Sequence, residues 1–177
     1  MGKLKYKELN TKRLILRAPK PSDYEHQFNY LKNPKNFEFA DYKVAETKAD
    51  VEVFFKRMFK DHLETSLFWM ICDKKSDKPV GTLSAWNVDY EVNSIEFGYT
   101  IYPEHRGKGY MYEVLNKTID FCYEELGFTV FDIWTDKNNK PSLGLAIKLG
   151  FKFSGFVDEA AKNTDTTITY ATYQLKK

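Results

Sequence analysis

The segment from Ser94 to Leu126 constrains the fold most, because its apolar residues change their spacing on either side of a glycine-containing loop. In residues 94–101, apolar side chains alternate with small or polar ones, which is the period-two pattern of a β-strand with one buried face. After Gly109 the apolar residues recur every three or four positions and stop at Gly127, as in an amphipathic helix. The residues of this helical stripe are Met111, Val114, Leu115, Thr118, Ile119, Cys122 and Leu126. The segment therefore predicts a strand, a loop and a helix in succession.

The rest of the chain predicts further strands and helices, with no linker, repeat or low-complexity tract between them. The further strands are expected at residues 13–18, 67–72, 80–88, 128–135, 152–157 and 166–175. Helices are expected at three places with capping signals: after Ser22-Asp23-Tyr24-Glu25, after Thr47, and at residues 141–149 behind Asn138 or Asn139. This order predicts a mixed α/β (α+β) fold with a central β-α-β unit, in a single domain of residues 1–177.

The loop of residues 102–112, between the strand at 94–101 and the helix that follows it, has the features of an anion-binding site. Gly107 and Gly109 let the backbone approach a ligand closely. The helix that follows begins with unpaired N–H groups and the positive end of its dipole. Arg106 and Lys108 add positive charge, so the loop suits a phosphate or pyrophosphate. An ordinary glycine-containing loop with solvated basic residues is the alternative.

Other nucleotide-binding motifs fit this loop less well. A P-loop requires Ser or Thr where Gly109 follows the lysine, and a dinucleotide-binding motif requires a third glycine where Tyr112 stands. The RNA-recognition motif shares four positions with the loop, which are Arg106, Gly107, Gly109 and Tyr110. Lys108 and Glu113 occupy positions where that motif needs aromatic residues, and the downstream spacing is helical. An RNA-binding module is therefore kept as the alternative class.

Charge and composition exclude several other classes. The formal net charge of +2 is too small to indicate nucleic acid or a membrane surface as a partner. The longest apolar run, residues 67–72, is far shorter than a membrane span, so a cytoplasmic protein is expected. Cys72 and Cys122 lie far apart in apolar contexts, and the three histidines have no ligand spacing with them. We therefore expect neither a disulfide nor a metal site.

The segment from Ile95 to Tyr110 resembles the acetyl-CoA-binding motif of the GNAT superfamily of N-acetyltransferases. The loop of that family has the pattern Gln/Arg-x-x-Gly-x-Gly/Ala. Arg106 and Gly109 match this pattern, whereas Met111 replaces the final small residue. Because the replacement leaves the main-chain N–H in place, the resemblance still implies cofactor binding at this loop.

Two further blocks are similar to the same family. Residues 139–142 (Asn-Lys-Pro-Ser), followed by Leu-Gly-Phe at residues 149–151, resemble its second signature. Residues 10–17, with Asp23 downstream, are similar to the start of the Rim-type N-terminal acetyltransferases of ribosomal proteins. The resemblance spans nearly the whole chain. It implies a GNAT-like mixed, mostly antiparallel sheet of about seven strands with helices on both faces.

The resemblance also implies where acetyl-CoA binds. The strand that ends at Ile101 and the strand from Phe128 would separate, and the cofactor would enter between them. The pyrophosphate would lie beside Arg106 on the N–H groups of Gly107, Lys108, Gly109, Tyr110, Met111 and Tyr112. The pantetheine arm would pair with the main chain near Thr100, Ile101 and Tyr102 and bond to Asn139, and Ser142 would lie near the sulfur.

Acetyl transfer needs a neutral amine, whereas a lysine-like amine is mostly protonated at pH 7, so a base has to take its proton. Glu96 is the candidate base, because it lies on the polar face of its strand just before the cofactor segment; the alternative is a structural pair with a lysine of a neighbouring strand. Ser142 is the candidate acid for the departing thiolate, and its alternative is a helix-turn residue bonded to backbone. Many family members carry a tyrosine four residues later, where this chain has Ala146. The acid role therefore falls to Ser142, to water, or to one of the nearby tyrosines, Tyr99, Tyr102, Tyr110 and Tyr112.

The expected activity is transfer of an acetyl group from acetyl-CoA to a primary amine by direct transfer. The acceptor stays open between a protein N-terminus and a small amine, and the assembly between a monomer and a homodimer. A non-catalytic acyl-CoA-binding domain is the second alternative. Neither nucleic acid nor a membrane is an expected partner.

Overall fold

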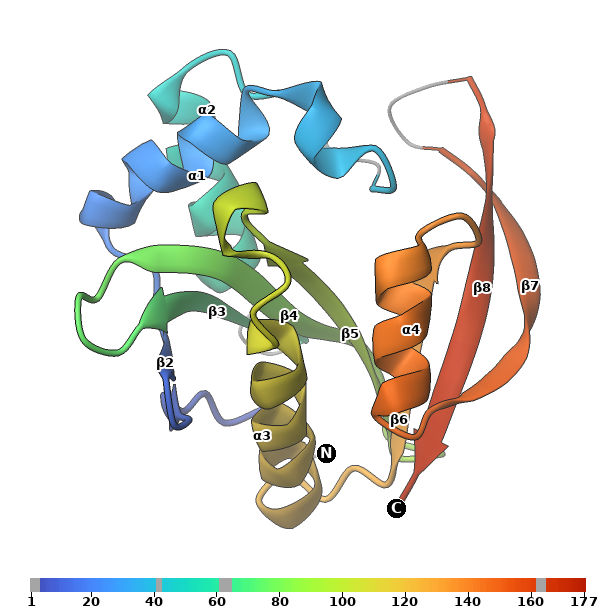
Figure 1. The fold of residues 1–177 in the computed structure, drawn as a ribbon. Coiled ribbons are helices and arrows are strands. Elements are labelled where there is room, and N and C mark those ends of the chain that lie inside the picture. Colours follow the sequence, from blue (N-terminus) through green and yellow to red (C-terminus); the bar gives the residue numbers. More distant parts are fainter. Residues whose placement is uncertain (1–3, 41–42, 61–64, 162–164) are drawn as a thin grey trace.

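The computed structural model describes residues 4–40, 43–60, 65–161 and 165–177 (Figure 1). Its strands are β1 (Leu9–Asn10), β2 (Leu14–Arg17), β3 (Leu67–Asp73), β4 (Pro79–Asp89), β5 (Ser94–Ile101), β6 (Val130–Asp136), β7 (Lys152–Ala160) and β8 (Thr167–Lys176). Its α-helices are α1 (Tyr24–Leu31), α2 (Lys48–Phe55), α3 (Tyr110–Glu124) and α4 (Lys140–Lys148). The strand and helix on either side of the glycine loop are thus the elements that the change of spacing predicts.

The strands of the described residues form one eight-stranded sheet in the order β1-β2-β3-β4-β5-β6-β8-β7. β5 and β6 run parallel, and the other neighbouring pairs are antiparallel. The prediction of a mixed, mostly antiparallel sheet is confirmed. The sheet has eight strands where about seven are predicted; the additional strand is β1, which has only two residues and is too short to show a period.

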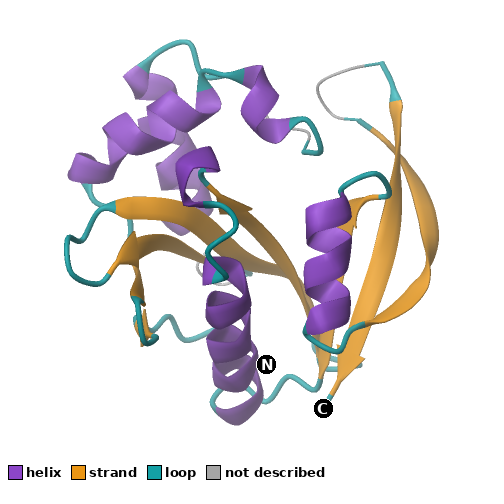
Figure 2. Ribbon diagram, in the orientation of Figure 1, coloured by secondary structure: helices purple, strands orange, loops and turns teal. Residues whose placement is uncertain are grey.

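Helices cover both faces of the sheet, as predicted (Figure 2). α3 packs its apolar stripe into the main core with Phe97 of β5 and Phe131 of β6, whose rings stack with centroids 5.9 Å apart. α1 and α2 contribute to a second cluster on the opposite face, with Phe68 and Met70 of β3. Because successive side chains of a strand point to opposite faces, one sheet supplies both cores.

The first helical segment begins differently from the prediction. The expected capping box of Ser22 and Glu25 does not form; a short 3₁₀ turn, Pro21–Asp23, precedes α1, and the Asp23 carboxylate accepts the N–H of Lys20 at 2.7 Å. Asp23 also forms two hydrogen bonds with the buried guanidinium of Arg17, at 2.8 and 2.9 Å. A buried charge needs a partner, and the sequence pattern alone does not show that Arg17 supplies it. The second expected box, at Thr47, forms as predicted.

β5 and β6 pair over three residues only and then diverge. Ser94–Glu96 faces Val130–Asp132, with Glu96 opposite Asp132 as the last pair. Beyond it, β5 stays paired with β4 through Ile101, and β6 stays paired with β8 through Asp136. The rest of β5 therefore has one unpaired edge. We call the region between Phe97–Ile101 and Ile133–Asp136 the β5–β6 splay; α3 and α4 lie on its two sides in Figure 1.

Candidate active site

The loop between β5 and α3 has two glycines in the left-handed region of backbone space. Gly107 has a φ of 74° and Gly109 a φ of 73°, which side-chain-bearing residues rarely adopt. Gly109 is also the N-cap of α3, where it supplies no side chain to cap the helix. The first N–H groups of α3 therefore stay uncovered by the residue that precedes them.

The main-chain N–H groups of this loop are free to bind a ligand. The N–H of Arg106 bonds the carbonyl of Pro103 at 3.2 Å, and the N–H of Glu113 bonds that of Gly109 at 3.3 Å. Between them, the six N–H groups of residues 107–112 have no acceptor in the described part of the chain. Six successive donors at the positive end of a helix dipole fit a pyrophosphate. They are the six groups that the sequence predicts, and their binding role stays a prediction.

The two basic side chains of the loop turn back to the preceding residues. Arg106 donates through Nε to the carbonyl of Ile101 at 3.1 Å and through Nη2 to that of Asn36 at 3.2 Å. Lys108 donates through Nζ to the carbonyl of Glu104 at 3.1 Å. Both side chains are exposed, and no ion pair among the described residues includes either of them, so their charge is available beside the free N–H groups.

Arg13 also belongs to this site, although the sequence pattern does not indicate its role. Its Nη1 donates to the carbonyl of Lys108 at 2.9 Å, and its guanidinium lies 4.6 Å from the centre of the Tyr110 ring. Glu113 of α3 holds Arg13 in place by accepting its main-chain N–H at 2.8 Å and its Nε at 2.7 Å. Arg13 therefore fixes the loop conformation, while its own charge is neutralised by Glu113. Its contact with Lys108 joins residues 95 positions apart, which sequence spacing cannot reveal.

We expect Glu113→Gln to raise the dissociation constant of CoA by about 3- to 10-fold, because the ion pair that holds Arg13 against the loop is replaced by a weaker neutral hydrogen bond. Calorimetric titration with CoA measures the change. Glu125→Gln is the matched control, since Glu125 pairs with Lys7 on the surface at 2.6 Å and does not contact the loop. Equal CoA affinity of the Glu113 and Glu125 variants would show that Arg13 does not shape the binding loop.

β5 presents alternate main-chain groups to the β5–β6 splay. The N–H of Tyr102 donates to the carbonyl of Val80 at 2.9 Å, in register with the β4–β5 ladder. Because antiparallel pairs alternate between bonded and non-bonded, Thr100 also bonds toward β4, whereas the groups of Tyr99 and Ile101 point toward the splay. Both main-chain groups of Tyr102 are bonded within the chain. Of the three residues predicted to pair with the pantetheine arm, Ile101 is thus the one with main-chain groups on the splay; its carbonyl already accepts from Arg106, which leaves its N–H as the group without a partner among the described residues.

Glu96 lies where the splay begins. Its side chain is 7% exposed, and Asn87 donates to its Oε2 through Nδ2 at 3.1 Å. Burial raises the pKa of Glu96 to about 7, and the nearby carboxylates of Asp132 and Glu159 add to this increase. The alternative of a lysine pair is not observed, since no ion pair of the described residues includes Glu96. A carboxyl group that titrates near neutrality suits a general base.

Ser142 lies in the first turn of α4, on the other side of the splay. Its N–H donates to Oδ1 of Asn139 at 3.3 Å. The side-chain carbonyl of Asn139 therefore caps the N-terminus of α4. The Ser142 hydroxyl lies 2.7 Å from the hydroxyl of Tyr99. Ala146, one turn later, is fully buried. Of the candidates that the sequence leaves for the acid, the structure therefore brings Ser142 and Tyr99 together.

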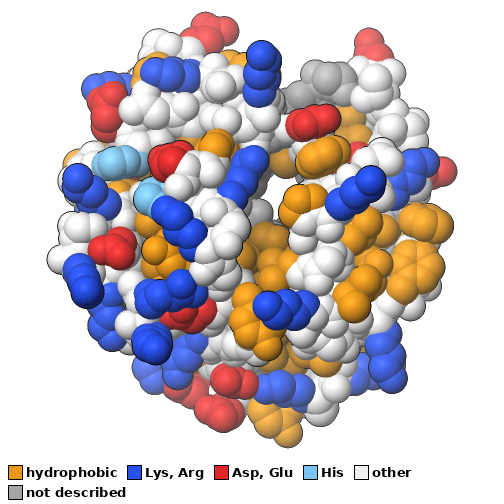
Figure 3. Space-filling model, in the orientation of Figure 1, with side chains coloured by type: hydrophobic (Ala, Val, Ile, Leu, Met, Phe, Trp, Pro, Cys, Tyr) orange, Lys and Arg blue, Asp and Glu red, His pale blue; other side chains and the backbone are white. Residues whose placement is uncertain are grey.

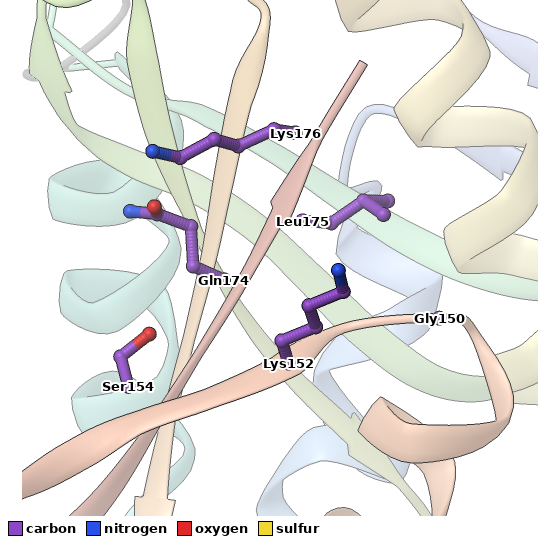
Figure 4. A pocket seen from close by; sticks show the side chains of 6 residues that line it. All are labelled: Gly150, Lys152, Ser154, Gln174, Leu175 and Lys176. Carbon is purple, nitrogen blue, oxygen red and sulfur yellow. The ribbon is translucent and has the colours of Figure 1, made fainter.

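The surface of the molecule is hollowed between α3 and α4, two of the elements that carry predicted site residues (Figure 3). Figure 3 shows the molecule hollowed between the half that carries α3 and the half that carries α4, with basic side chains gathered on the α3 side. A second hollow, of about 200 Å³, lies beside β7 and β8 (Figure 4). Its lining residues are Gly150, Lys152, Ser154, Gln174, Leu175 and Lys176. It contains none of the predicted site residues.

Three features of the structure bear on other classes of function. No helix of the described residues is long and apolar enough to cross a membrane. In the same parts of the chain, no three His, Cys, Asp or Glu side chains are grouped so that they could hold a metal ion. Residues 110–124 form a helix, whereas the RNA-recognition motif requires a strand at this position.

Comparison with known proteins identifies the family. The family model of the GNAT acetyltransferase domain matches residues 13–152. The N-acetyltransferase YoaA of Bacillus subtilis is 23% identical over 172 residues, which cover 96% of both chains. Spermidine N(1)-acetyltransferase of Vibrio cholerae is 23% identical over 148 residues, 82% of this chain and 83% of that protein. The chain therefore belongs to the GNAT acetyltransferase family.

A solved structure supports the fold independently of sequence identity. The ribosomal L7/L12 alpha-N-protein acetyltransferase RimL, in complex with coenzyme A, superposes with a TM-score of 0.82. It is 17% identical and covers 96% of this chain and 98% of its own. At this identity the likeness shows the fold alone. With the family match, the protein is an acetyl-CoA-dependent N-acetyltransferase, and the free N–H groups of residues 107–112 are consistent with that cofactor.

Proposed function

We propose that this enzyme acetylates a primary amine by direct transfer, with Glu96 as the general base. The observation that carries the proposal is the position of Glu96, a buried carboxyl group at the last β5–β6 pair with a pKa of about 7. Glu96 thus lies where the splay begins, while the loop of residues 107–112 offers its N–H groups beyond the other end of β5. The proposal treats residues 1–177 as one acetyltransferase domain.

Residues along and beside β5 have separate roles in cofactor binding and in acetyl transfer. Acetyl-CoA, when bound, supplies the acetyl group as an activated thioester. The N–H groups of residues 107–112 bind its pyrophosphate, with Arg106 and Lys108 adding charge, and Ile101 and the amide nitrogen of Asn139 contact the pantetheine arm. Glu96 takes the amine proton, directly or through water. The main-chain N–H of Tyr99 or Ile101 stabilises the negative charge that develops on the carbonyl oxygen.

The setting of the two cysteines favours direct transfer over a covalent acyl-enzyme. Cys72 and Cys122 are fully buried, and burial raises the pKa of each thiol to about 12. The thiolate is the nucleophilic form of cysteine, and at neutral pH it is almost absent from such a group. Glu96 acting on the amine itself therefore accounts for transfer without an enzyme-bound acetyl group.

The acceptor is a primary amine of a protein N-terminus or of a small molecule. The relatives include both kinds, since RimL is named for a protein α-amine and the Vibrio cholerae enzyme for spermidine. Glu38, Asp41, Glu46 and Asp50 lie between β2 and β3, where they suit either a cationic acceptor or a solvated helix face. Asp50 caps α2, and Asp41 lies outside the described residues. These residues therefore do not single out a cationic small molecule. The enzyme is proposed to be cytoplasmic and to act as a monomer or a homodimer.

Release of free CoA thiol from acetyl-CoA tests the proposal on a panel of amines. The panel contains peptides with free N-termini, the same peptides with blocked N-termini, spermidine and a lysine derivative. We expect thiol release to depend on the enzyme and on a free amine, with one class of acceptor clearly preferred. Tight CoA binding without acceptor-dependent release on any amine would favour the non-catalytic acyl-CoA-binding alternative.

A further inference from the structure

The side chain of Tyr99 reaches across the splay on the face opposite to Glu96. Successive side chains of β5 alternate between its faces, so Tyr99 shares the face of Phe97, which lies in the main core with α3. The hydroxyl oxygen of Tyr99 lies 2.7 Å from Oγ of Ser142, on the helix that follows β6. The two hydroxyls therefore meet beyond the last β5–β6 pair, Glu96 with Asp132.

Both hydroxyl groups are shielded from bulk water but not closed off. Ser142 is 7% exposed, and Tyr99 packs against the main core while keeping part of its surface accessible. Burial raises the pKa of Tyr99 to about 12, and the hydrogen bond with Ser142 offsets only part of this increase. Tyr99 is therefore protonated, and able to donate a hydrogen bond, throughout the neutral pH range.

We infer that the Tyr99 hydroxyl donates a hydrogen bond to the leaving sulfur of acetyl-CoA and that Ser142 positions this hydroxyl. The inference rests on the proposed acetyl transfer. As the bond from the acetyl carbon to nitrogen forms and its bond to sulfur breaks, the electron pair of the broken bond stays on sulfur, where Tyr99 stabilises the charge. Ser142 donates to the Tyr99 oxygen, which leaves the phenol proton free to point into the splay. The amine releases its protons to solvent through Glu96, and solvent supplies the proton that completes the thiol.

The pKa values decide between a hydrogen bond and a full proton transfer from Tyr99. An alkyl thiol such as cysteine has a pKa of about 8.5, well below the value of about 12 for Tyr99. The proton therefore stays on the phenol while sulfur carries the charge. Ser142, the acid expected from the sequence, becomes a positioning residue for Tyr99.

Tyr99→Phe tests the inference, because phenylalanine keeps the ring and removes the donor. A hydrogen bond to a charged group contributes ~1.5–3 kcal/mol, so kcat should fall about 10- to 150-fold. The dissociation constant of CoA should stay within about twofold. Since Tyr99 stays protonated, the pH–rate profile should keep its shape at a lower height. Tyr123→Phe is the matched control, on an exposed tyrosine of α3 outside the site.

The double variant with Ser142→Ala separates positioning from an independent role. If Ser142 acts through Tyr99, Ser142→Ala lowers kcat in the wild-type background and adds almost nothing to Tyr99→Phe. Additive effects would overturn the role of Ser142, and a kcat of Tyr99→Phe equal to that of Tyr123→Phe would overturn the role of Tyr99. Circular dichroism and CoA titration show that each variant is folded. An inactive wild-type enzyme on every amine would instead refute the proposed function.

Discussion

Replacement of Gly109 by valine is expected to abolish measurable CoA binding while the fold is retained. Gly109 has a φ of 73°, a conformation that costs a β-branched residue of the order of 1–3 kcal/mol. The position is open, since a Cβ at residue 109 would have Nη2 of Arg13 as its nearest neighbour, at 3.7 Å. The valine side chain would therefore be accommodated, but it would stand over the free N–H groups of the loop. We expect a loss of affinity of at least about 100-fold.

A matched variant separates backbone strain from the loss of the binding surface. Gly127→Val introduces valine at a φ of 80°, also without a close contact, at the far end of α3. Both variants should lose similar stability in thermal unfolding, whereas calorimetry should show normal CoA binding for Gly127→Val alone. A Gly109→Val protein that is folded by circular dichroism and binds CoA as the wild type does would show that the loop is only a turn.

Glu96→Gln is expected to lower kcat by about 100- to 10,000-fold at neutral pH, the usual contribution of a general base. Glutamine keeps the shape of the side chain and an oxygen that can accept the hydrogen bond from Asn87, but it cannot take a proton. CoA affinity should not change, because Glu96 lies at the opposite end of β5 from the binding loop. Glu124→Gln, on the surface of α3, is the control for loss of a carboxylate elsewhere.

The pH dependence of both proteins makes this test specific. With a pKa of about 7, Glu96 becomes ionised and able to accept a proton as the pH rises through neutrality, so wild-type kcat should rise over this range. The variant should follow the titration of the amine alone, and its deficit should shrink as the pH approaches the amine pKa. Parallel profiles of equal height would reject Glu96 as the base.

Glu96→Gln should lower activity but raise the free energy of unfolding above neutral pH. Unfolding returns the pKa of Glu96 from about 7 to its ordinary value near 4.5. The folded state therefore binds more protons than the unfolded state between these values, and the wild type loses stability as the pH rises through this range. Glu96→Gln lacks this loss and should be more stable at pH 8, by up to an amount of the order of 3 kcal/mol. A stabilised but inactive variant would mark Glu96 as a residue kept for function.

Local pattern predicted the elements that carry the site. β5 begins at Ser94 and ends at Ile101, the bounds that the alternation predicts, because the apolar side chains of one face pack into or against the main core. α3 and the N-cap Asn139 of α4 were also predictable, since glycine, asparagine and proline mark helix ends through backbone chemistry. β1 was not predictable, because two residues carry no period.

Contacts between distant residues were not predictable from local pattern. Asp23, whose carboxylate accepts the N–H of Lys20 before α1, also pairs with the buried Arg17, and no spacing rule reveals that contact. The hydrogen bonds from Arg13 to Lys108 and between Tyr99 and Ser142 join residues 95 and 43 positions apart. The sequence thus predicts the loop and the base, whereas the three-dimensional fold adds the residue that holds the loop and the partner of Ser142.

Identification of the acetylated product by mass spectrometry tests the central claim most directly. The enzyme is incubated with isotopically labelled acetyl-CoA and the amine that gives the fastest thiol release, and the masses of both the amine and the intact protein are measured. We predict that the label appears on the amine nitrogen in an amount equal to the thiol released, and that the protein carries none. Label held on the protein before its transfer, or thiol released without labelled amine, would contradict direct acetylation of an amine by this enzyme.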